Sequence, residues 1–277
     1  MRYRRLGALV ASLVAVGCSH AGSDDHAFRW MAEVPAGAVV HFRDGAGNIT
    51  VRRGSASGQQ IIVNGSRQWR RGRAKDVRFT VSQVGNDYYV CAMWSGSGKC
   101  GPSGYKGRST GGFLTMFSLF HRGSDASADF VAEVPANVKL DARTTFGSVD
   151  ISGSGAGVIA RTTNGNVSAA NVSGPVALTT TSGNVVLSVD SVSDSDSIRV
   201  STTNGNIRAD LPAALQGRFD LAASNGMVHS NLPLPSAQSG KSMRRIQGQV
   251  GTLDRLVRLH TMNGIVSVTT RGTPSTH

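Results

Sequence analysis

A cluster of cationic residues surrounds a tryptophan between residues 67 and 75. Guanidinium groups bind phosphate and carboxylate through paired hydrogen bonds, and an indole ring can stack on a ligand or hold a cation over its face. The cluster is therefore a candidate anion-binding site, with a solvated basic loop as the alternative. As a nucleic-acid motif it is generic, and we expect no nucleic-acid partner. Its members are Arg67, Trp69, Arg70, Arg71, Arg73 and Lys75.

Cys18 stands where an export signal would end. Three arginines among the first five residues precede an apolar stretch, Leu6–Val16, which is too short to span a bilayer but suits a signal peptide. The four residues that end at Cys18 resemble a bacterial lipobox, so we expect residues 1–17 to be a signal peptide and 18–27 a linker after a lipidated cysteine. Ordinary cleavage without lipid is the alternative. Either way the protein is exported, and with Ser19 beside the lipid an outer-membrane or periplasmic location in the bacterial cell envelope is expected.

Cys91 and Cys100 are the other two cysteines of the chain. In an oxidising compartment they are expected to form a disulfide that closes a ten-residue ring, worth about 2.5–3 kcal/mol in the chain-entropy model. Two free thiols are the alternative. Two cysteines with no histidine at ligand spacing do not indicate a metal site.

The glycine-rich run Gly96-Ser97-Gly98-Lys99-Cys100-Gly101 looks like the end of a phosphate-binding loop. A Walker loop would need glycine where Met93 stands and Ser or Thr where Cys100 stands, and no helical period follows to hold a phosphate. We therefore expect no nucleotide cofactor, and interpret the glycines as the turn of a disulfide ring.

Asp190, Asp194 and Asp196 are the one cluster of acidic residues that suggests catalysis or calcium binding. The cluster lacks the glycine and glutamate of a calcium loop, which favours a polar bulge. Polysaccharide-cleaving β-helices use aspartate–arginine pairs in a groove, so Asp190 with Arg199 or Arg208 is the enzyme hypothesis to consider. The histidines are scattered and no nucleophile elbow occurs. We therefore expect no enzymatic activity.

The formal charge of +12 at pH 7 comes mainly from arginine. On an exported protein a strong positive field favours anionic envelope partners, such as acidic polysaccharide or lipid headgroups. Arginine on solvated strand faces would give the same charge without a partner. The composition is rich in Gly, Ser, Thr and Val, and no long helical period follows the signal, so the elements to expect are strands and turns.

A short pattern repeats seven times around a glycine, and this repeat must position any site. Apolar residues stand seven and five places before the glycine and two and four places after it, with few lapses. From the second copy the spacing is 18, 18, 22, 21 and 38 residues, so we interpret the last step as two periods with one glycine lost near residues 238–251. The central glycines are Gly47, Gly147, Gly165, Gly183, Gly205, Gly226 and Gly264.

These repeats predict an all-β fold, a right-handed parallel β-solenoid with coils of about 20 residues. Asn-Gly between alternating strands is also a hairpin signal, so an antiparallel meander or sandwich is the alternative. Like residues recur at like positions, for example Thr162 with Thr180 and Asn166 with Asn184. Parallel stacking would align them in ladders, which favours the solenoid.

A segment at residues 52–129 interrupts the repeat. Ala-Glu-Val-Pro-Ala opens the first copy at residue 32 and recurs at residue 132, so the chain restarts there. The single β-strand-repeat domain is expected over residues 28–271, with a tail at 272–277. The apolar run at 113–120 is expected to cap the solenoid, with a partner or membrane contact as the alternative. We expect the inserted segment to fold against one end and present a basic, aromatic-edged surface.

The Val-Pro opening strand followed by Thr-Thr-Asn/Ser-Gly-Asn-Val units resembles the bacterial putative-adhesin family of β-strand repeats, a domain of unknown function related to the head-GIN domains. The resemblance implies an extracytoplasmic β-helical domain, often on envelope lipoproteins, without established catalytic residues. We therefore expect a non-enzymatic lipoprotein whose solenoid is an interaction or scaffolding surface for an anionic envelope polymer or lipid. A polysaccharide-binding or polysaccharide-cleaving β-helix is the alternative.

Overall fold

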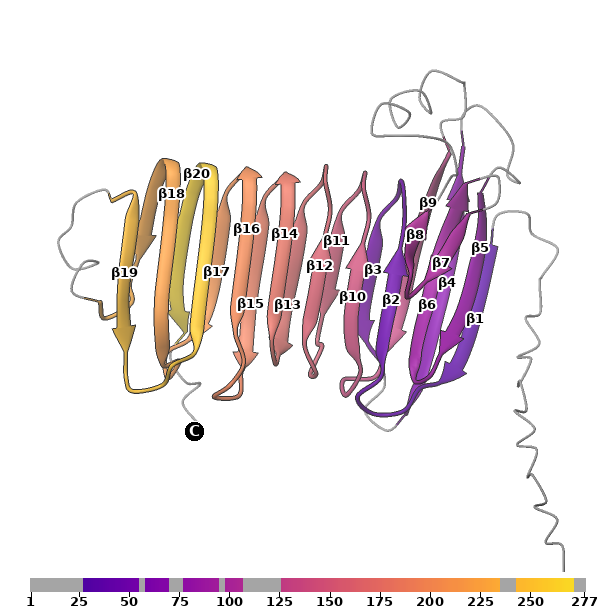
Figure 1. The fold of residues 1–277 in the computed structure, drawn as a ribbon, viewed down its shortest axis with the longest axis horizontal. Helices are drawn as coiled ribbons and strands as arrows, with labels where there is room; N and C mark the ends of the chain where they lie inside the picture. The colour runs from indigo at the N-terminus through magenta and orange to yellow at the C-terminus, as the bar shows by residue number, and fades with distance from the viewer. Residues whose placement is uncertain are drawn as a thin grey trace, which may run out of the picture.

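The computed structural model describes residues 27–54, 58–69, 77–94, 98–106, 126–234 and 243–271. In these residues the chain forms twenty β-strands, which wind into an elongated solenoid with two walls (Figure 1). Inside the solenoid the strands are parallel, so the β-solenoid is confirmed and the antiparallel meander is wrong for the coils. The predicted signal peptide, Cys18, the apolar run at 113–120 and residues 272–277 lie outside the described residues.

The strands that precede the central glycines make one wall, which we call wall 1. Hydrogen-bonded neighbours follow one another along it from the N-terminal to the C-terminal end of the stack. In spatial order, wall 1 contains β5 (Val77–Val84), β6 (Asp87–Trp94), β2 (Val39–Arg43), β10 (Lys139–Arg143), β12 (Val158–Arg161), β14 (Val176–Ser182), β16 (Ile198–Asn204), the first half of β20 (Leu256–Arg271), the first half of β18 (Gly217–Ser230) and β19 (Arg245–Val250).

The strands that follow the glycines make the opposite wall, wall 2. The long strands β18 and β20 run through the turn and belong to both walls. In spatial order, wall 2 contains β1 (Ala27–Glu33), β4 (Gln60–Gln68), β9 (Ser127–Val134), β3 (Ile49–Arg53), β11 (Val149–Ser152), β13 (Val167–Ser173), β15 (Val185–Ser191), β17 (Ile207–Pro212) and the second halves of β20 and β18.

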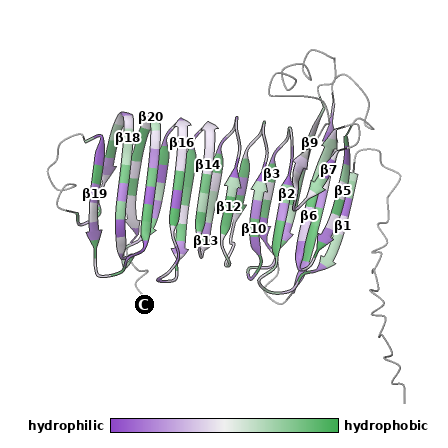
Figure 2. Ribbon diagram, in the orientation of Figure 1, coloured by the Kyte–Doolittle hydropathy of each residue, from purple (hydrophilic) through white to green (hydrophobic). Residues whose placement is uncertain are grey.

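The core lies between the walls because every coil alternates apolar and polar residues. Val167 pairs with Val185, and both are fully buried, as the ladder interpretation predicts. Leu178 and Leu187 are buried in the same way on the two walls. Burial of one such side chain contributes about 1.5–3 kcal/mol, and the alternation is visible along each strand (Figure 2).

At one edge of the solenoid the central glycines stack backbone on backbone. Gly165 has φ +152°, and a Cβ placed on it would lie 2.0 Å from the carbonyl oxygen of Gly147. Only glycine fits, because both the left-handed region and the close approach exclude a side chain. The Thr-Thr-Asn-Gly-Asn signal therefore makes a tight corner rather than a hairpin.

Two polar ladders flank the glycine stack. Five threonines each donate a hydroxyl hydrogen bond of 2.8–3.0 Å to the central glycine carbonyl of the neighbouring coil. On the other side of the glycine, Asn166 accepts a hydrogen bond from the backbone N–H of Asn184, and Asn184 accepts one from Asn206, at 2.9 and 2.8 Å. The threonines are Thr144, Thr162, Thr180, Thr202 and Thr261.

The coils do not stack in chain order at the C-terminal end. The coil of β20 lies between the coil of β16 and β17 and the coil of β18, as the yellow strand between orange ones in Figure 1 shows. The segment between them holds β19, which pairs antiparallel with β18 as an edge strand. A coil with a lost glycine near residues 238–251 is therefore wrong: the described part of that segment is the edge strand β19, and the coil of β20 lies between the two coils that precede it in the chain.

The inserted segment extends the walls at the N-terminal end, as predicted for its position. β6 pairs in parallel with β2 on wall 1, and β4 pairs antiparallel with β1 and β9 on wall 2. Phe79 fills the end of the core, with its ring centroid 5.0 Å from Phe28 and 5.2 Å from Phe130. Aromatic rings thus close the core where the coils stop.

Candidate functional site

A small hairpin covers part of the outer face of wall 1. It consists of β7 (Lys99–Gly101) and β8 (Gly104–Lys106). The strand period places Tyr89, Cys91 and Met93 on the outer side of β6, and the predicted disulfide between Cys91 and Cys100 is present and draws the hairpin onto them. The Tyr105 hydroxyl donates a 2.6 Å hydrogen bond to the Ala92 carbonyl.

A polar cavity of about 450 Å³ lies between this hairpin and wall 1. We call it the hairpin cavity. The hairpin supplies one side of it through backbone, proline and tyrosine, and the strands β2 and β10 with the turns after them supply the other through charged and hydroxyl side chains. Its lining is His41, Arg43, Asp44, Tyr89, Gly101, Pro102, Gly104, Tyr105, Asp141, Arg143, Thr144 and Thr145.

Asp141 is the centre of an ion-pair network in this cavity. Arg43 Nη2 lies 2.6 Å from Asp141 Oδ2, and Arg143 Nε lies 2.8 Å from Oδ1. His41 Nδ1 lies 3.0 Å from Oδ2, and its ring stacks on Tyr89 at 4.3 Å. Burial alone would raise the pKa of Asp141, but the hydrogen bonds from His41, Arg143 and Arg43 outweigh it and hold that pKa well below its usual range. With one carboxylate against two guanidinium groups, the network keeps a net positive charge.

Asp44 differs from Asp141 because no cation compensates its burial. Its Oδ1 accepts a 3.2 Å hydrogen bond from the Ala46 N–H, while Oδ2 is buried without a partner in the described residues. Burial raises the pKa of Asp44 well above its usual value. Asp44 stands at the ladder position that threonine occupies in the next coils, and its burial favours the protonated form of the carboxyl over the charged one.

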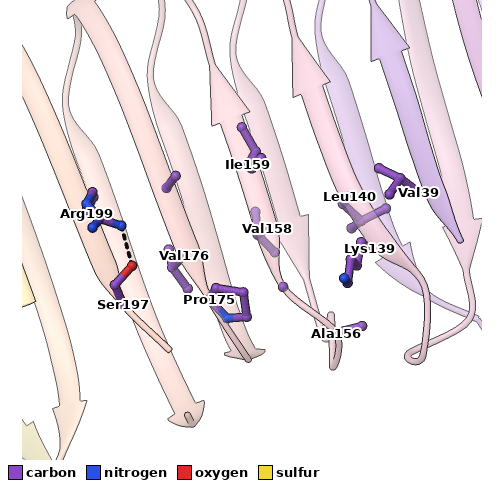
Figure 3. A pocket seen from close by; sticks show the side chains of 12 residues that line it. Val39, Lys139, Leu140, Ala156, Val158, Ile159, Pro175, Val176, Ser197 and Arg199 are labelled. Carbon is purple, nitrogen blue, oxygen red and sulfur yellow. Dashed lines mark hydrogen bonds between the residues drawn. The ribbon is translucent and has the colours of Figure 1, made fainter. Parts of the chain in front are cut away.

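A second hollow, an apolar groove of about 240 Å³, crosses wall 1 beside the hairpin cavity (Figure 3). Ile159, Pro175 and Ala177 line its middle on the outer side of the wall, and Lys139 and Arg199 stand towards its two ends. The groove runs from β2 to β16, four strand spacings or about 19 Å. It offers an apolar floor with a cation at each end.

The two walls differ in charge although they have the same architecture. The strands of wall 1 carry nine basic and three acidic residues, a formal charge of +6, whereas those of wall 2 carry six of each. A second acidic centre, Asp220, lies towards the other end of wall 1, with Arg245 2.9 Å and Arg258 3.1 Å away. The basic residues of wall 1 are Arg43, Arg78, Lys139, Arg143, Arg161, Arg199, Arg218, Arg245 and Arg258.

The candidate anion site predicted from sequence is only partly described. Arg67 lies on β4 in wall 2 with its guanidinium 5.3 Å from the centre of the Phe79 ring, and Trp69 follows that strand half-buried. Arg70, Arg71, Arg73 and Lys75 lie outside the described residues, so the cluster stays a prediction. The sequence reasoning missed His41, Asp141 and Arg143. One signal for them was available in the sequence: Arg43 and Arg143 stand at equivalent positions after the two Ala-Glu-Val-Pro-Ala segments, which predicts that they lie on neighbouring strands.

The acidic residues of the predicted bulge do not converge. Asp190 faces Arg271 at 3.4 Å, and Asp194 faces Arg255 at 3.4 Å. Asp190 lies on wall 2 whereas Arg199 lies on wall 1, so that pair of the enzyme hypothesis does not form. Among the described residues, no three His, Cys, Asp or Glu side chains gather in a way that could hold a metal ion. The described ranges also contain no helix long and apolar enough to cross a membrane.

The described chain is a parallel β-solenoid with a capped end and one basic outer wall. The model of the Toastrack DUF4097 family matches residues 124–269, and the chain belongs to this family. The match confirms the resemblance to the putative-adhesin repeats. No curated protein matches the chain.

Solved structures of adhesin-like proteins resemble the chain over most of its length. A putative cell adhesion protein from Clostridium sporogenes is 9% identical, with 88% of this chain and 100% of that chain covered and a TM-score of 0.43. A putative adhesin from Bacteroides fragilis is 9% identical, with 88% and 97% covered and a TM-score of 0.26. A putative adhesin from Parabacteroides merdae is 8% identical, with 90% and 97% covered and a TM-score of 0.22.

Proposed function

We propose that the protein is a non-enzymatic, lipid-anchored protein of the bacterial cell envelope whose wall 1 binds an acidic polysaccharide. The charge difference between the walls carries this proposal. Both walls are built from the same repeats, so folding alone gives no reason for nine basic against three acidic residues on one and equality on the other. A one-sided positive field concentrates an anionic partner on that side.

The surface shape of wall 1 favours a polysaccharide over a lipid bilayer as the partner. Apolar residues form the floor of a groove on this wall, and its exposed large apolar side chains, Val84, Ile159 and Met262, stand singly on three separate strands. Binding to a bilayer interior would need protruding apolar side chains. A sugar chain presents apolar ring faces and carboxylates, which match the groove floor and the cations Lys139 and Arg199 at its ends.

Binding of polygalacturonate to the purified full chain in detergent tests this function. We expect binding at low salt that is largely lost near about 1 M salt, where the screening length falls to about 3 Å. Neutral dextran should not bind. Replacing Lys139, Arg161 and Arg199 with serine should weaken binding at least about tenfold without lowering the melting temperature.

A matched variant on wall 2 provides the control. Replacing Arg52, Arg53 and Arg208 with serine removes the same charge from the other wall and should leave affinity nearly unchanged. Equal losses in both variants would show that only net charge matters and would contradict the assignment to wall 1. Binding to phosphatidylglycerol vesicles but not to polygalacturonate would replace the polymer with a lipid partner. Cleavage of the polymer would overturn the non-enzymatic proposal.

The membrane anchor is tested by mass spectrometry of the mature N-terminus. We expect Cys18 as the first residue, carrying acyl chains, because the sequence before it resembles a lipobox. A free amine at Ser19 or Gly22 without acyl chains would contradict the anchor.

A further inference from the structure

We propose that the hairpin cavity binds a sugar acid, a single carboxylated unit at the end of the polysaccharide held on wall 1. This inference rests on the proposed function and names the group that gives it specificity. It places recognition in a described site that the hairpin partly covers instead of on the open basic wall.

The size and the chemical lining of the hairpin cavity suit such a ligand. About 450 Å³ falls within the usual range for small-molecule sites. A sugar acid has one carboxylate, several hydroxyls and an apolar ring face. The cavity offers a net positive ion-pair network, hydroxyl groups and the rings of Tyr89 and Tyr105.

Arg143 is the residue that the carboxylate would contact. Its Nε and Nη2 hold Asp141, and its side chain is 42% exposed. Within the described residues Nη1 donates no hydrogen bond, so it stays available at the cavity. Arg43 is less available, because it is 12% exposed and donates to two backbone carbonyls besides Asp141.

One further group suits the sugar hydroxyls. Asp44 lines the cavity as a residue, but its Oδ2 is buried beside Gly47 and is not offered to a ligand. The Thr145 hydroxyl also lines the cavity, whereas that of Thr144 is occupied by the Gly47 carbonyl at 3.0 Å.

The hairpin cavity continues the groove of wall 1. Val39 and Lys139 line the groove, and two residues further along the same strands His41 and Asp141 line the cavity. Two residues of strand correspond to about 6.6 Å. A chain lying in the groove can therefore place its end unit under the hairpin, and the Cys91–Cys100 disulfide holds the hairpin in place over that unit.

Titration of the full chain with digalacturonate tests the site, with digalactose as the neutral control ligand. We expect the acid to bind and the neutral disaccharide to bind at least about tenfold more weakly. Arg143→Gln should weaken binding of digalacturonate by a similar factor, because the variant keeps a hydrogen-bond donor for Asp141 but removes the positive charge. Equal affinity for both disaccharides would overturn the assignment to a sugar acid.

Blocking the cavity separates this site from the open wall. Gly101 lines the cavity, and a Cβ there meets no atom within 4 Å, so Gly101→Trp should fill the space and abolish digalacturonate binding. Ser103→Trp, in the exposed turn of the same hairpin, is the control and should leave digalacturonate binding unchanged. Replacing both Cys91 and Cys100 with serine should weaken the binding of digalacturonate at least about tenfold. The salt-sensitive binding of polygalacturonate should remain.

The outcomes distinguish the two proposals. If polygalacturonate binds through wall 1 but digalacturonate does not bind, or binds unchanged in the folded Gly101→Trp protein, the cavity proposal is wrong and the proposed function stands. If neither ligand binds the folded chain at low salt, both are wrong.

Discussion

Asp44 is the residue at which the threonine ladder departs from its pattern. In the next coils threonine fills this position and donates a hydrogen bond to a glycine carbonyl, whereas Asp44 keeps Oδ2 buried and unpartnered in the described part of the chain. Leaving a buried polar group unsatisfied costs about 1–3 kcal/mol.

Asp44→Asn should therefore stabilise the protein at neutral pH, by about 1–3 kcal/mol, and change its pH dependence. Because burial raises the pKa of Asp44, the unfolded chain releases this proton more readily than the folded one. The stability contributed by the neutral acid is complete below the unfolded pKa of about 4 and is lost as the pH rises through the folded pKa. Denaturant titrations from pH 4 to 8 should show the advantage of the variant growing with pH. An advantage that shrinks with pH would contradict a neutral Asp44.

Asp141 affects the pH dependence of stability in the opposite direction. Its folded pKa is depressed, so its contribution is present above the unfolded pKa of about 4 and is lost as the pH falls through the folded value. Asp141→Asn should lower stability at pH 7, and this loss of stability should become smaller as the pH falls. Denaturant titrations of this variant below pH 4 check the sign, and Asp196→Asn, whose carboxylate caps the Ser193 N–H in an exposed loop, is a control with a smaller effect.

At the scale of the coil, the glycine stack sets the spacing of everything else. Gly165→Ala places a Cβ 2.0 Å from the Gly147 carbonyl in a left-handed conformation and should cost roughly 3 kcal/mol or more. Gly85→Ala is the control: its φ is +60°, but nothing lies within 4 Å, so the cost should be about 1 kcal/mol. Thermal melts of both variants test this, and similar losses would show that conformation, not close stacking, requires the glycines.

The ladders make a second prediction at this scale. Val185→Asp puts an unpaired charge in the core between Val167 and Ile207 and should cost several kcal/mol, about 3–5. Asn184→Asp keeps the oxygen that accepts from the Asn206 N–H and should cost less. If both behave as surface substitutions in chemical denaturation, the register of the coils is wrong.

At the scale of the whole molecule, the last coil in the chain is internal in space. β20 pairs with β16 and β17 on one side and with β18 on the other. Deleting residues 217–254 removes the outer coil and β19 but preserves the pairing of β20 with the stack. This variant should fold, melt at a lower temperature and self-associate through its exposed edge.

Truncation after residue 255 provides the contrast. It removes fewer residues from the chain terminus, but it takes away an interior coil and should leave the end of the stack unfolded. Circular dichroism and size-exclusion chromatography distinguish the two variants. A well-folded truncation would show that β18 can take the place of β20 and would contradict the order of coils described above.

Much of this architecture followed from the sequence. The period of the apolar residues, the glycines that admit no side chain and the Thr and Asn ladders are local properties, so they predict parallel coils and the inward direction of Val185. The disulfide of Cys91 and Cys100 followed from the cysteine count and the predicted export. Which coil lies beside which is not local. The coils of β18 and β20 carry the same glycine pattern, and only the pairing of β20 with β16 and β17 on one side and β18 on the other shows that β20 lies inside. The meeting of Asp141 with His41 and Arg43 across 98 to 100 residues, and the closure of a cavity over them by the β7–β8 hairpin, likewise depend on stacking that the tertiary structure alone decides.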